Sequence, residues 1–487
     1  MARRLIWRIL VMLHRYLGVA VGALMLLWFA SGIVMLFVPY PALGESERVG
    51  MLEPIPWQLC CGDLGSALSA DQPLERAEVE TVSGIPALRF ALPGQQGMLV
   101  SLDATTPVVP LDAPHARATA VAAAMRLGVM PAQPLATTTI VRDQWTVSGE
   151  YRADRPLYRF DFGDPAGTQI YVSSQRGRVV LRTTAAQRFW NWLGAVPHWL
   201  YPTILRSHPK TWTQVVIWTS LLGVFLTAMG LYLGIAQYRF RGGNLLSPYR
   251  GVWNWHHSLG LLFGVFSLTW IVSGLISMNP WGFLEGGDGV EPTPEVHSVT
   301  WGEVRSSLAA IAKAPPSSDI VTLSMVPLAG NLCWMATDHR GTAMRLAADG
   351  HRQPMTDADL QIAARHAAGP SGIASRVLLR DEDAYYYRHH APLLLPVLRV
   401  IVNDPDHTWL YLDPRSGRVL GQFDADGRWQ RWLFDGLHRL DFLAQLRASR
   451  IWTALVVFLL VGGIGLTGTG TYMAVRRLIL DLSKASG

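Results

Sequence analysis

The hydrophobic pattern divides the chain into four long apolar segments separated by mixed regions. Four runs contain no Asp, Glu, Lys or Arg: Tyr16–Gly44, Thr211–Tyr238, Gly251–Leu284 and Ile451–Val475. Each exceeds the roughly 20 helical residues that cross a hydrocarbon core about 30 Å thick. Buried helices of soluble proteins seldom stay uncharged beyond about 14 residues. The pattern therefore predicts four transmembrane helices in a lipid bilayer.

Basic residues predict how these helices are oriented. They gather at one end of the spans: Arg3, Arg4, Arg8 and Arg15 before the first, Arg239, Arg241 and Arg250 between the second and third, and Arg476, Arg477 and Lys484 after the fourth. Cytoplasmic flanks carry the excess of Lys and Arg, so we expect a multi-pass protein of a bacterial inner membrane. Both termini would be cytoplasmic and the large domains periplasmic. These flanks largely explain the net charge of +6, so nucleic-acid binding is not expected.

The two halves of the chain repeat each other at an offset of 240 to 242 residues. The recurring pairs are His14/His256, Gly18/Gly260, Gly22/Gly264, Trp28/Trp270, Ser31/Ser273, Gly32/Gly274, His198/His438, Trp212/Trp452, Thr227/Thr467 and Gly230/Gly470. Agreement over spans and loops indicates a duplication. Each unit crosses the membrane twice, so both copies have the same orientation and their symmetry axis follows the membrane normal. Equivalent residues can then face each other across that axis.

These features predict four transmembrane α-helices with α+β periplasmic domains, arranged as two tandem parallel repeats. Strand-like runs such as Gln169–Ser173 and Thr408–Asp413, each followed by a turn, predict two small sheet-plus-helix modules per half. The Trp-rich stretches Phe189–Leu205 and Trp429–Leu446 are typical of interfacial helices. The expected boundaries are 1–39 for helix 1, 40–187 for periplasmic region 1, 188–241 for an interfacial helix and helix 2, 242–284 for a cytoplasmic loop and helix 3, 285–427 for periplasmic region 2, and 428–487 for an interfacial helix, helix 4 and the tail.

The spacing of the three cysteines predicts little about their chemistry. Cys60, Cys61 and Cys333 all fall in the regions predicted outside the membrane. No C-x-x-C-H sequence occurs, so covalent attachment of a c-type haem is not supported. A disulfide from Cys60 or Cys61 to Cys333 is one option.

The histidines at the ends of the spans form the candidate site. His14 and the His256-His257 pair lie near the cytoplasmic starts of the first and third spans, and His198 and His438 lie on the outer side. An ionisable residue at membrane depth indicates function, and neutral imidazole is a common axial ligand of haem iron. The repeat would bring His14 to His256 and His198 to His438. We expect two bis-histidine haem b sites, with His257 as an alternative to His256; the simpler alternative is that these histidines anchor helices.

Other chemical patterns are weak or absent. Asp381–Asp383 and Tyr385–His390 could hold iron, but a solvated turn leading into a tyrosine-rich strand is the preferred interpretation. No Walker A loop, G-x-G-x-x-G fingerprint or H-E-x-x-H helix occurs, and no flavin domain is evident. An electron donor would therefore have to be a separate molecule.

Two motifs carry a resemblance to a known family. His14-Arg15-Tyr16-Leu17-Gly18 opens a span and is echoed at His256–Gly260, and a periplasmic module ends in Trp409–Gly417. This pattern resembles the PepSY-associated transmembrane family over nearly the whole chain and implies PepSY-like periplasmic regions. That family includes iron-regulated inner-membrane proteins of siderophore uptake, some of which look like haem-containing ferrisiderophore reductases. The resemblance supports His14 and His256 directly, and His198 and His438 through the repeat.

The expected function is an oxidoreductase that carries electrons across the membrane to periplasmic ferric iron. The iron would be bound by a siderophore or another chelator, and the donor would be a cytoplasmic reductase or quinol. Two haems suit this task because one porphyrin cannot bridge about 30 Å, and no catalytic acid or base is needed. The alternative is a non-enzymatic PepSY membrane protein that binds or regulates a periplasmic partner. A transporter is disfavoured because no acidic residue lies within a span.

Overall fold

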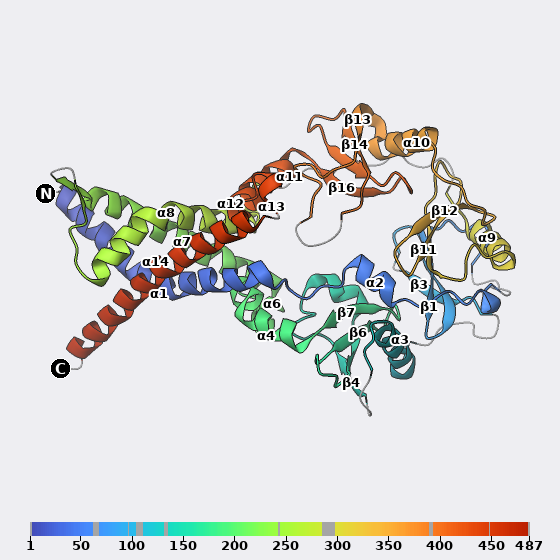
Figure 1. Cartoon of the computed structure of the whole chain (residues 1–487), viewed down its shortest axis with the longest axis horizontal. Coiled ribbons are helices and arrows are strands. Elements are labelled where there is room, and N and C mark those ends of the chain that lie inside the picture. Colours follow the sequence, from blue (N-terminus) through green and yellow to red (C-terminus); the bar gives the residue numbers. More distant parts are fainter. Residues whose placement is uncertain are drawn as a thin grey trace.

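The computed structural model describes residues 2–61, 68–95, 97–103, 111–130, 135–241, 244–284, 298–388, 393–447 and 449–485. Four long helices lie together at one end of the molecule and the three larger sheets lie at the other (Figure 1). We call the four helices the bundle and the sheet-containing part the head. Both chain termini lie at the end of the bundle away from the head. The predicted orientation requires them to share one side.

The bundle consists of α1 (Ala2–Phe37), α7 (Pro209–Gln237), α8 (Val252–Ile276) and α14 (Arg450–Ala485). All four are long and apolar enough to cross a membrane, as the uncharged runs predict. Lipid tails offer no hydrophobic drive for helix association, so close packing at small residues matters. Gly462 and Gly463 of α14 allow this close packing. A Cβ at Gly462 would collide with Phe263, and a Cβ at Gly463 would collide with Phe29.

The head contains three antiparallel sheets. The first has the order β12-β11-β10-β1-β2-β3, with β1 (Arg76–Val82), β2 (Ile85–Ala91), β3 (Met98–Ser101), β10 (Ile320–Met325), β11 (Cys333–Asp338) and β12 (Ala343–Ala347). The second comprises β4 (Ala136–Ile140), β5 (Leu157–Asp161), β6 (Gln169–Ser173) and β7 (Val179–Thr183). The third comprises β13 (Ile373–Leu379), β14 (Val397–Val402), β15 (Trp409–Leu412) and β16 (Val419–Phe423).

Short elements connect and cover these sheets. The helices are α2 (Glu45–Met51), α3 (Ala113–Arg126), α4 (Ala185–Leu193), α5 (Ala195–His198), α6 (Thr203–Arg206), α9 (Trp301–Lys313), α10 (Asp357–Ala368), α11 (Ala425–Gln430), α12 (Leu437–Arg439) and α13 (Ala444–Arg447), with a π-helical turn, η5 (Arg431–Gly436). Short 3₁₀ turns occupy Trp57–Leu59, Gly149–Asp154, Pro280–Gly282 and Gly369–Ser371. A two-stranded ribbon, β8 (Arg239–Arg241) and β9 (Asn244–Leu246), joins α7 to α8.

The six-stranded sheet is built from both halves of the chain. Strand β1 pairs antiparallel with β10, with Val79 opposite Leu323. Its core includes the fully buried Trp301 and Trp334. The first predicted module of each half therefore contributes its strands to one common sheet.

The second and third sheets are built alike. The Tyr171 hydroxyl on β6 donates to Asp143 Oδ2 at 2.8 Å, and the Tyr411 hydroxyl on β15 donates to Asp383 Oδ2 at 2.8 Å. Both tyrosines are completely buried. Residues 240 positions apart thus make the same hydrogen bond.

The predicted interfacial helices are broken rather than continuous. In the first half, α4 ends before Gly194, and a Cβ at Gly194 would lie 3.0 Å from Val34 of α1. The segment then divides into α5 and α6. In the second half, α11, η5, α12 and α13 replace one helix. Each break lets the segment turn its histidine toward the bundle.

The disulfide considered between Cys60 or Cys61 and Cys333 is wrong. Cys60 and Cys61 are bonded to each other, and Cys333 is a free, buried thiol. The two adjacent cysteines pack against the cluster that contains Trp301, whereas Cys333 belongs to a separate cluster with Met335.

A buried carboxylate ties α2 to the six-stranded sheet. Glu80 of β1 is 1% exposed and accepts hydrogen bonds from Arg48 of α2 and Arg89 of β2. Glu80→Gln would leave two largely buried guanidinium groups without this charge, so we expect the head to lose about 3 kcal/mol locally. Hydrogen exchange of the β1 and β2 amides measures this loss. The exposed Glu75→Gln is the matched control, and equal exchange in both variants would contradict the expectation.

The same carboxylate predicts a pH dependence. Burial raises the pKa of Glu80, but Arg89 and Arg48 outweigh burial and lower it to about 2. The ordinary value in an unfolded chain is about 4.3. A lowered carboxyl pKa gives stability that is complete above the unfolded value and lost as the pH falls through the folded one. Protection of β1 should therefore decline between about pH 4 and pH 2, and Glu80→Gln should lack this component.

Candidate functional site

Two histidines face each other at the end of the bundle away from the head. The ring centroids of His14 on α1 and His256 on α8 are 6.3 Å apart. His14 Nδ1 lies 3.2 Å from the Leu226 carbonyl oxygen of α7, and His256 Nδ1 lies 3.1 Å from the Leu466 carbonyl oxygen of α14. We call His14 and His256 the inner pair.

A second pair lies where the bundle meets the head. The ring centroids of His198, the last residue of α5, and His438 of α12 are 6.1 Å apart. His198 Nδ1 lies 3.0 Å from the Trp28 carbonyl oxygen of α1, and His438 Nδ1 lies 3.2 Å from the Trp270 carbonyl oxygen of α8. We call His198 and His438 the outer pair. The structure thus brings together both pairs that the repeat predicts.

The hydrogen bonds define the tautomer of all four imidazoles. A carbonyl oxygen only accepts hydrogen bonds, so each Nδ1 must carry the proton and each Nε2 must keep its lone pair. Among the described residues, no hydrogen bond occupies Nε2 of any member of either pair. A histidine that donates through one nitrogen to a main-chain carbonyl and leaves the other free is arranged as a metal ligand usually is.

Residues beside the histidines support this orientation. Ser31 Oγ and Ser273 Oγ each lie 3.1 Å from the Nδ1 atom of an outer histidine. Ser31 Oγ also donates to the Leu27 carbonyl, so its oxygen can accept from His198. These serines were not among the site residues predicted from the sequence. Their recurrence at an offset of 242 residues, which the inner histidines share, was the signal that could have found them.

Glycines make room for the inner imidazoles. A Cβ at Gly230 of α7 would lie 2.7 Å from His14 Cε1, and a Cβ at Gly470 of α14 would lie 3.0 Å from His256 Cε1. An alanine at either position would therefore require the neighbouring imidazole ring to move. These two glycines are repeat equivalents, and each positions one ring of the pair.

The two pairs lie at different depths of the bundle. Fourteen residues of α1 separate His14 from Trp28, whose carbonyl meets His198. At 1.5 Å per helical residue this is roughly 20 Å. Phe29 and Trp270, whose ring centroids are 5.7 Å apart, belong to the apolar core of the bundle.

His257 does not join the inner pair. Its Nδ1 lies 3.0 Å from Ser247 Oγ and its Nε2 lies 3.0 Å from the Gly234 carbonyl oxygen. Both ring nitrogens are therefore occupied, and His256 is the residue that faces His14.

The acidic and tyrosine-rich cluster has structural partners. Glu382 pairs with Arg447 at 2.8 Å, and Asp383 pairs with Arg399 at 3.1 Å. His389 and His390 lie outside the described residues. Among those described, no three His, Cys, Asp or Glu residues converge as ligands of a lone metal ion.

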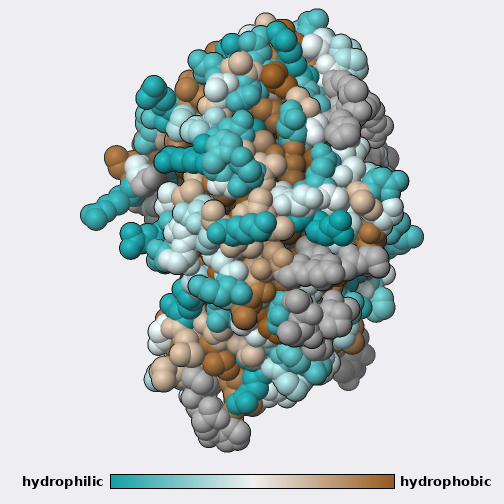
Figure 2. Space-filling model, turned by 90° about the vertical axis from the view of Figure 1, so that its right-hand side faces the viewer, coloured by the Kyte–Doolittle hydropathy of each residue, from teal (hydrophilic) through white to brown (hydrophobic). Residues whose placement is uncertain are grey.

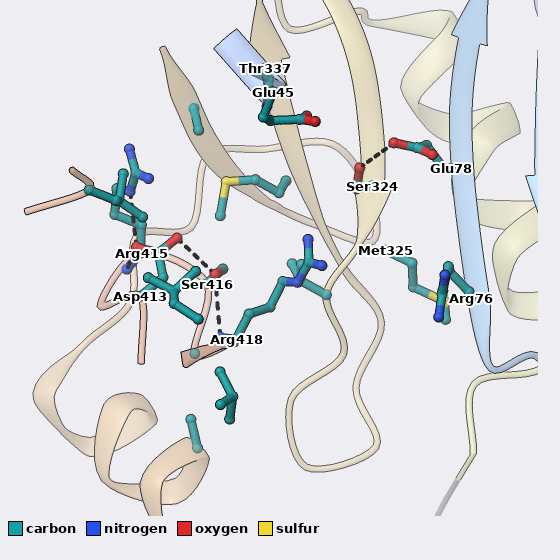
Figure 3. Close-up of a pocket in the computed structure, with 18 of the residues that line it drawn as sticks. Glu45, Arg76, Glu78, Ser324, Met325, Thr337, Asp413, Arg415, Ser416 and Arg418 are labelled. Atoms are coloured by element: carbon teal, nitrogen blue, oxygen red, sulfur yellow. Dashed lines mark hydrogen bonds and ion pairs between the residues drawn. The ribbon is translucent and has the colours of Figure 1, made fainter. Parts of the chain in front are cut away.

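A large cleft of about 2600 Å³ lies in the head, lined by both halves of the chain. Figure 3 shows Asp413, Arg415 and Arg418, from the turn between β15 and β16, on one side and Arg76 and Glu78 of β1 on the other. Arginine and carboxylate side chains stand along its wall together with many apolar residues. Its lining includes no residue of the elements that carry the two histidine pairs.

Repeat-equivalent arginines line this cleft. Arg178 and Arg418 are 240 positions apart and both contribute to the wall. Burial and the nearby Arg89 lower the pKa of Arg178. The end of the head farthest from the bundle is covered by many hydrophilic residues with apolar ones between them (Figure 2). Such a surface suits exposure to water.

Comparisons with known proteins add no relative. No protein-family model matches the sequence, and no curated protein matches it. The paired imidazoles are therefore the main basis for a function.

Proposed function

We propose that the protein is a haem b-containing inner-membrane reductase, built as two parallel repeats, that passes electrons across the membrane to periplasmic ferric iron in iron acquisition. One observation carries the proposal: two pairs of facing imidazoles lie at different depths of an apolar bundle, each with Nδ1 bonded to a main-chain carbonyl. The resemblance to PepSY-associated membrane proteins adds that the iron would be chelated by a siderophore.

The residues fit haem in three respects. A metal–imidazole bond of about 2 Å on each side of one iron atom places two ring centres about 6 Å apart, and the observed separations are 6.3 and 6.1 Å. Each histidine keeps the lone pair of Nε2 for a metal. The bundle also has an apolar core, which includes Phe29 and Trp270.

The chain's own residues would orient and insulate the two sites. Bound between paired imidazoles, haem b would supply reversible one-electron chemistry. The carbonyls of Leu226, Leu466, Trp28 and Trp270 fix the four rings. Because the pairs lie roughly 20 Å apart along α1, two sites cover a depth that one porphyrin could not.

The direction of electron flow follows from the basic flanks. By the positive-inside rule the inner pair would lie at the cytoplasmic side, where a separate reductase or quinol would donate, and the outer pair beneath the head. Reduction suits iron release because siderophores bind ferric iron through hard oxygen donors. Ferrous iron is softer and less charged, so the same donors hold it less tightly.

A reduced-minus-oxidised absorbance spectrum of the purified full-length protein tests the proposal. We expect sharp b-type bands and about two haems per chain, with reoxidation of the bands on addition of a ferric chelate. A folded protein with no haem bands after expression with ample haem would refute it. The PepSY-type alternative, recognition of a periplasmic partner by the head, would then be the function to pursue.

Gly230→Ala should disturb the inner site alone. The added Cβ would lie 2.7 Å from His14 Cε1, so the ring must tilt and its hydrogen bond to Leu226 must lengthen. Loss of such a supporting interaction typically weakens metal binding about 10- to 100-fold. The measurement is haem content, which should fall from about two per chain toward one. Gly18→Ala, on α1 with nothing within 4 Å of its Cβ, should retain both; equal haem in the two variants would contradict the packing argument.

A further inference from the structure

A second cavity lies one aromatic ring, that of Phe434, away from the outer pair. It has a volume of about 600 Å³ and is lined by Arg388, Arg431 and Arg439 together with Tyr385, Tyr387 and Phe434. We call it the arginine–aromatic pocket. Its size falls within the range of small-molecule sites, about 300 to 1,000 Å³.

The wall of the pocket contains a buried arginine with one hydrogen-bond donor that lacks an acceptor. Arg431 of η5 is 4% exposed; its Nε donates to the Ala384 carbonyl and its Nη2 to the Asp441 carbonyl, each at 2.8 Å. Its Nη1 is buried and has no hydrogen-bond partner among the described residues. A buried donor without an acceptor is costly and rare in native proteins. The guanidinium also lies over two aromatic rings, with Cζ 4.7 Å from the ring centroid of Tyr387 and 4.6 Å from that of Trp432.

Charge in the pocket favours an anion. Its wall carries three arginines and one carboxylate, Asp435, which pairs with Arg439 at 3.3 Å. Asp441 lies behind Arg431, with Oδ2 3.5 Å from Nη2. Arg388 is exposed and makes no ion pair among the described residues. Guanidinium groups bind carboxylate-type oxygens in forked geometry and stack on aromatic rings.

The repeat provides an internal control for this pocket. The residues at the equivalent places of the first half are Ser148 for Arg388, Asn191 for Arg431, Trp199 for Arg439, Val147 for Tyr387 and Gly194 for Phe434. The histidines and the buried tyrosine–aspartate bonds are the same in both halves. The shared fold and the histidine pairs thus do not require the pocket's arginines, which are an addition to one copy.

The pocket is also one ring away from the outer pair. Phe434 stacks on His438 with ring centroids 5.2 Å apart and planes inclined by 27°. It belongs to η5, and isolated π-helical turns occur often at functional sites. The larger cleft has no such contact with an element that carries a histidine.

We propose that the arginine–aromatic pocket is the docking site of the iron chelate, and that it selects an anionic chelate with catecholate or carboxylate donors over a neutral trihydroxamate. This assignment rests on the proposed function. One electron from the cytoplasmic donor, a reduced flavin or quinol, converts one Fe(III) to Fe(II). The covalent bonds of the chelator do not change. Arg388 and Arg439 bind the charged rim of the complex, and the buried Arg431 adds positive charge at the base.

Binding of a redox-inert gallium complex tests the assignment without any electron transfer. The probe is gallium(III) tris-catecholate, titrated into the full-length protein in detergent and followed by calorimetry. Arg388→Gln and Arg439→Gln change exposed side chains and should each weaken binding about tenfold or more. Arg152→Gln, an exposed arginine of the first half, is the matched control and should leave binding unchanged. A neutral gallium trihydroxamate should bind wild type at least about tenfold more weakly.

The outcomes separate this assignment from the reductase proposal. Equal affinity of wild type and both pocket variants, or equal affinity for the neutral complex, overturns the docking site even if haem is present. Arginine-dependent binding in a protein without haem bands would support the docking site while the reductase proposal fails. Arg431→Asn, which installs the residue of the first half, is a second variant; it should also weaken tris-catecholate binding, with folding checked by hydrogen exchange of β14 and β15.

Discussion

Replacing His198 with alanine should remove one of the two proposed haems and slow the proposed ferric reduction by more than about a hundredfold. The loss of a residue that merely supports a metal ligand already costs 10- to 100-fold, and His198 would be the ligand itself. His438 would face a gap across the 6.1 Å separation of the pair. The haem content should therefore fall from about two per chain to about one, with the inner site intact. His438→Ala should give the same result, because the pair acts as a unit.

An exposed histidine nearby provides the control for this experiment. His208 lies ten residues beyond His198 and has no ring partner among the described residues. His208→Ala should keep both haems and the full rate. If His198→Ala retained two haems per chain, the outer pair would not be an axial pair, and the histidines would revert to helix anchors.

The four spans were predictable because membrane crossing leaves a direct mark on sequence. Runs without charge identify α1, α7, α8 and α14. Their ends were less certain. The first run continues to Gly44, but α1 ends at Phe37, because Pro39 and Pro41 cannot continue a helix. At its N-terminal end, α1 includes several arginines that precede the uncharged run.

The merged six-stranded sheet could not be predicted. The pairing of β1 with β10 joins residues more than 240 positions apart, and no turn signal connects them. Glu80 illustrates the difficulty, because a carboxylate in a strand normally indicates a solvent-facing position. Only the approach of Arg48 and Arg89 explains its burial.

The candidate site was predictable as far as the repeat reaches. Recurrence identified all four paired histidines without any knowledge of distances. It could not separate His256 from His257, because neighbouring residues of a helix point about 100° apart and either could face the axis. The arginine–aromatic pocket left the opposite signal: its residues differ between the halves. Residues that agree between the two halves indicate the paired histidines, and residues that differ indicate the arginine–aromatic pocket of the second half.

Replacing His14 with alanine should leave a protein that can be reduced only from the side of the head. His256 alone cannot hold the inner site, while the outer pair, roughly 20 Å along α1, keeps its own hydrogen bonds to Trp28 and Trp270. We expect about one haem per chain. In right-side-out membrane vesicles loaded with dithionite, the remaining haem should stay oxidised, because the gap left at the inner site is too wide for rapid transfer. Dithionite added outside should reduce it at once.

The neighbouring histidine separates this result from general damage to the bundle. His257 bonds to Ser247 and Gly234 through both ring nitrogens and lies beside His256. His257→Gln should therefore keep two haems and accept electrons from trapped dithionite. Rapid reduction of His14→Ala from inside would show that electrons do not pass through the inner pair. Electrons would then have to reach the outer site directly. A His14 variant reducible from outside alone would assign the inner pair to the entry of electrons from the proposed cytoplasmic donor.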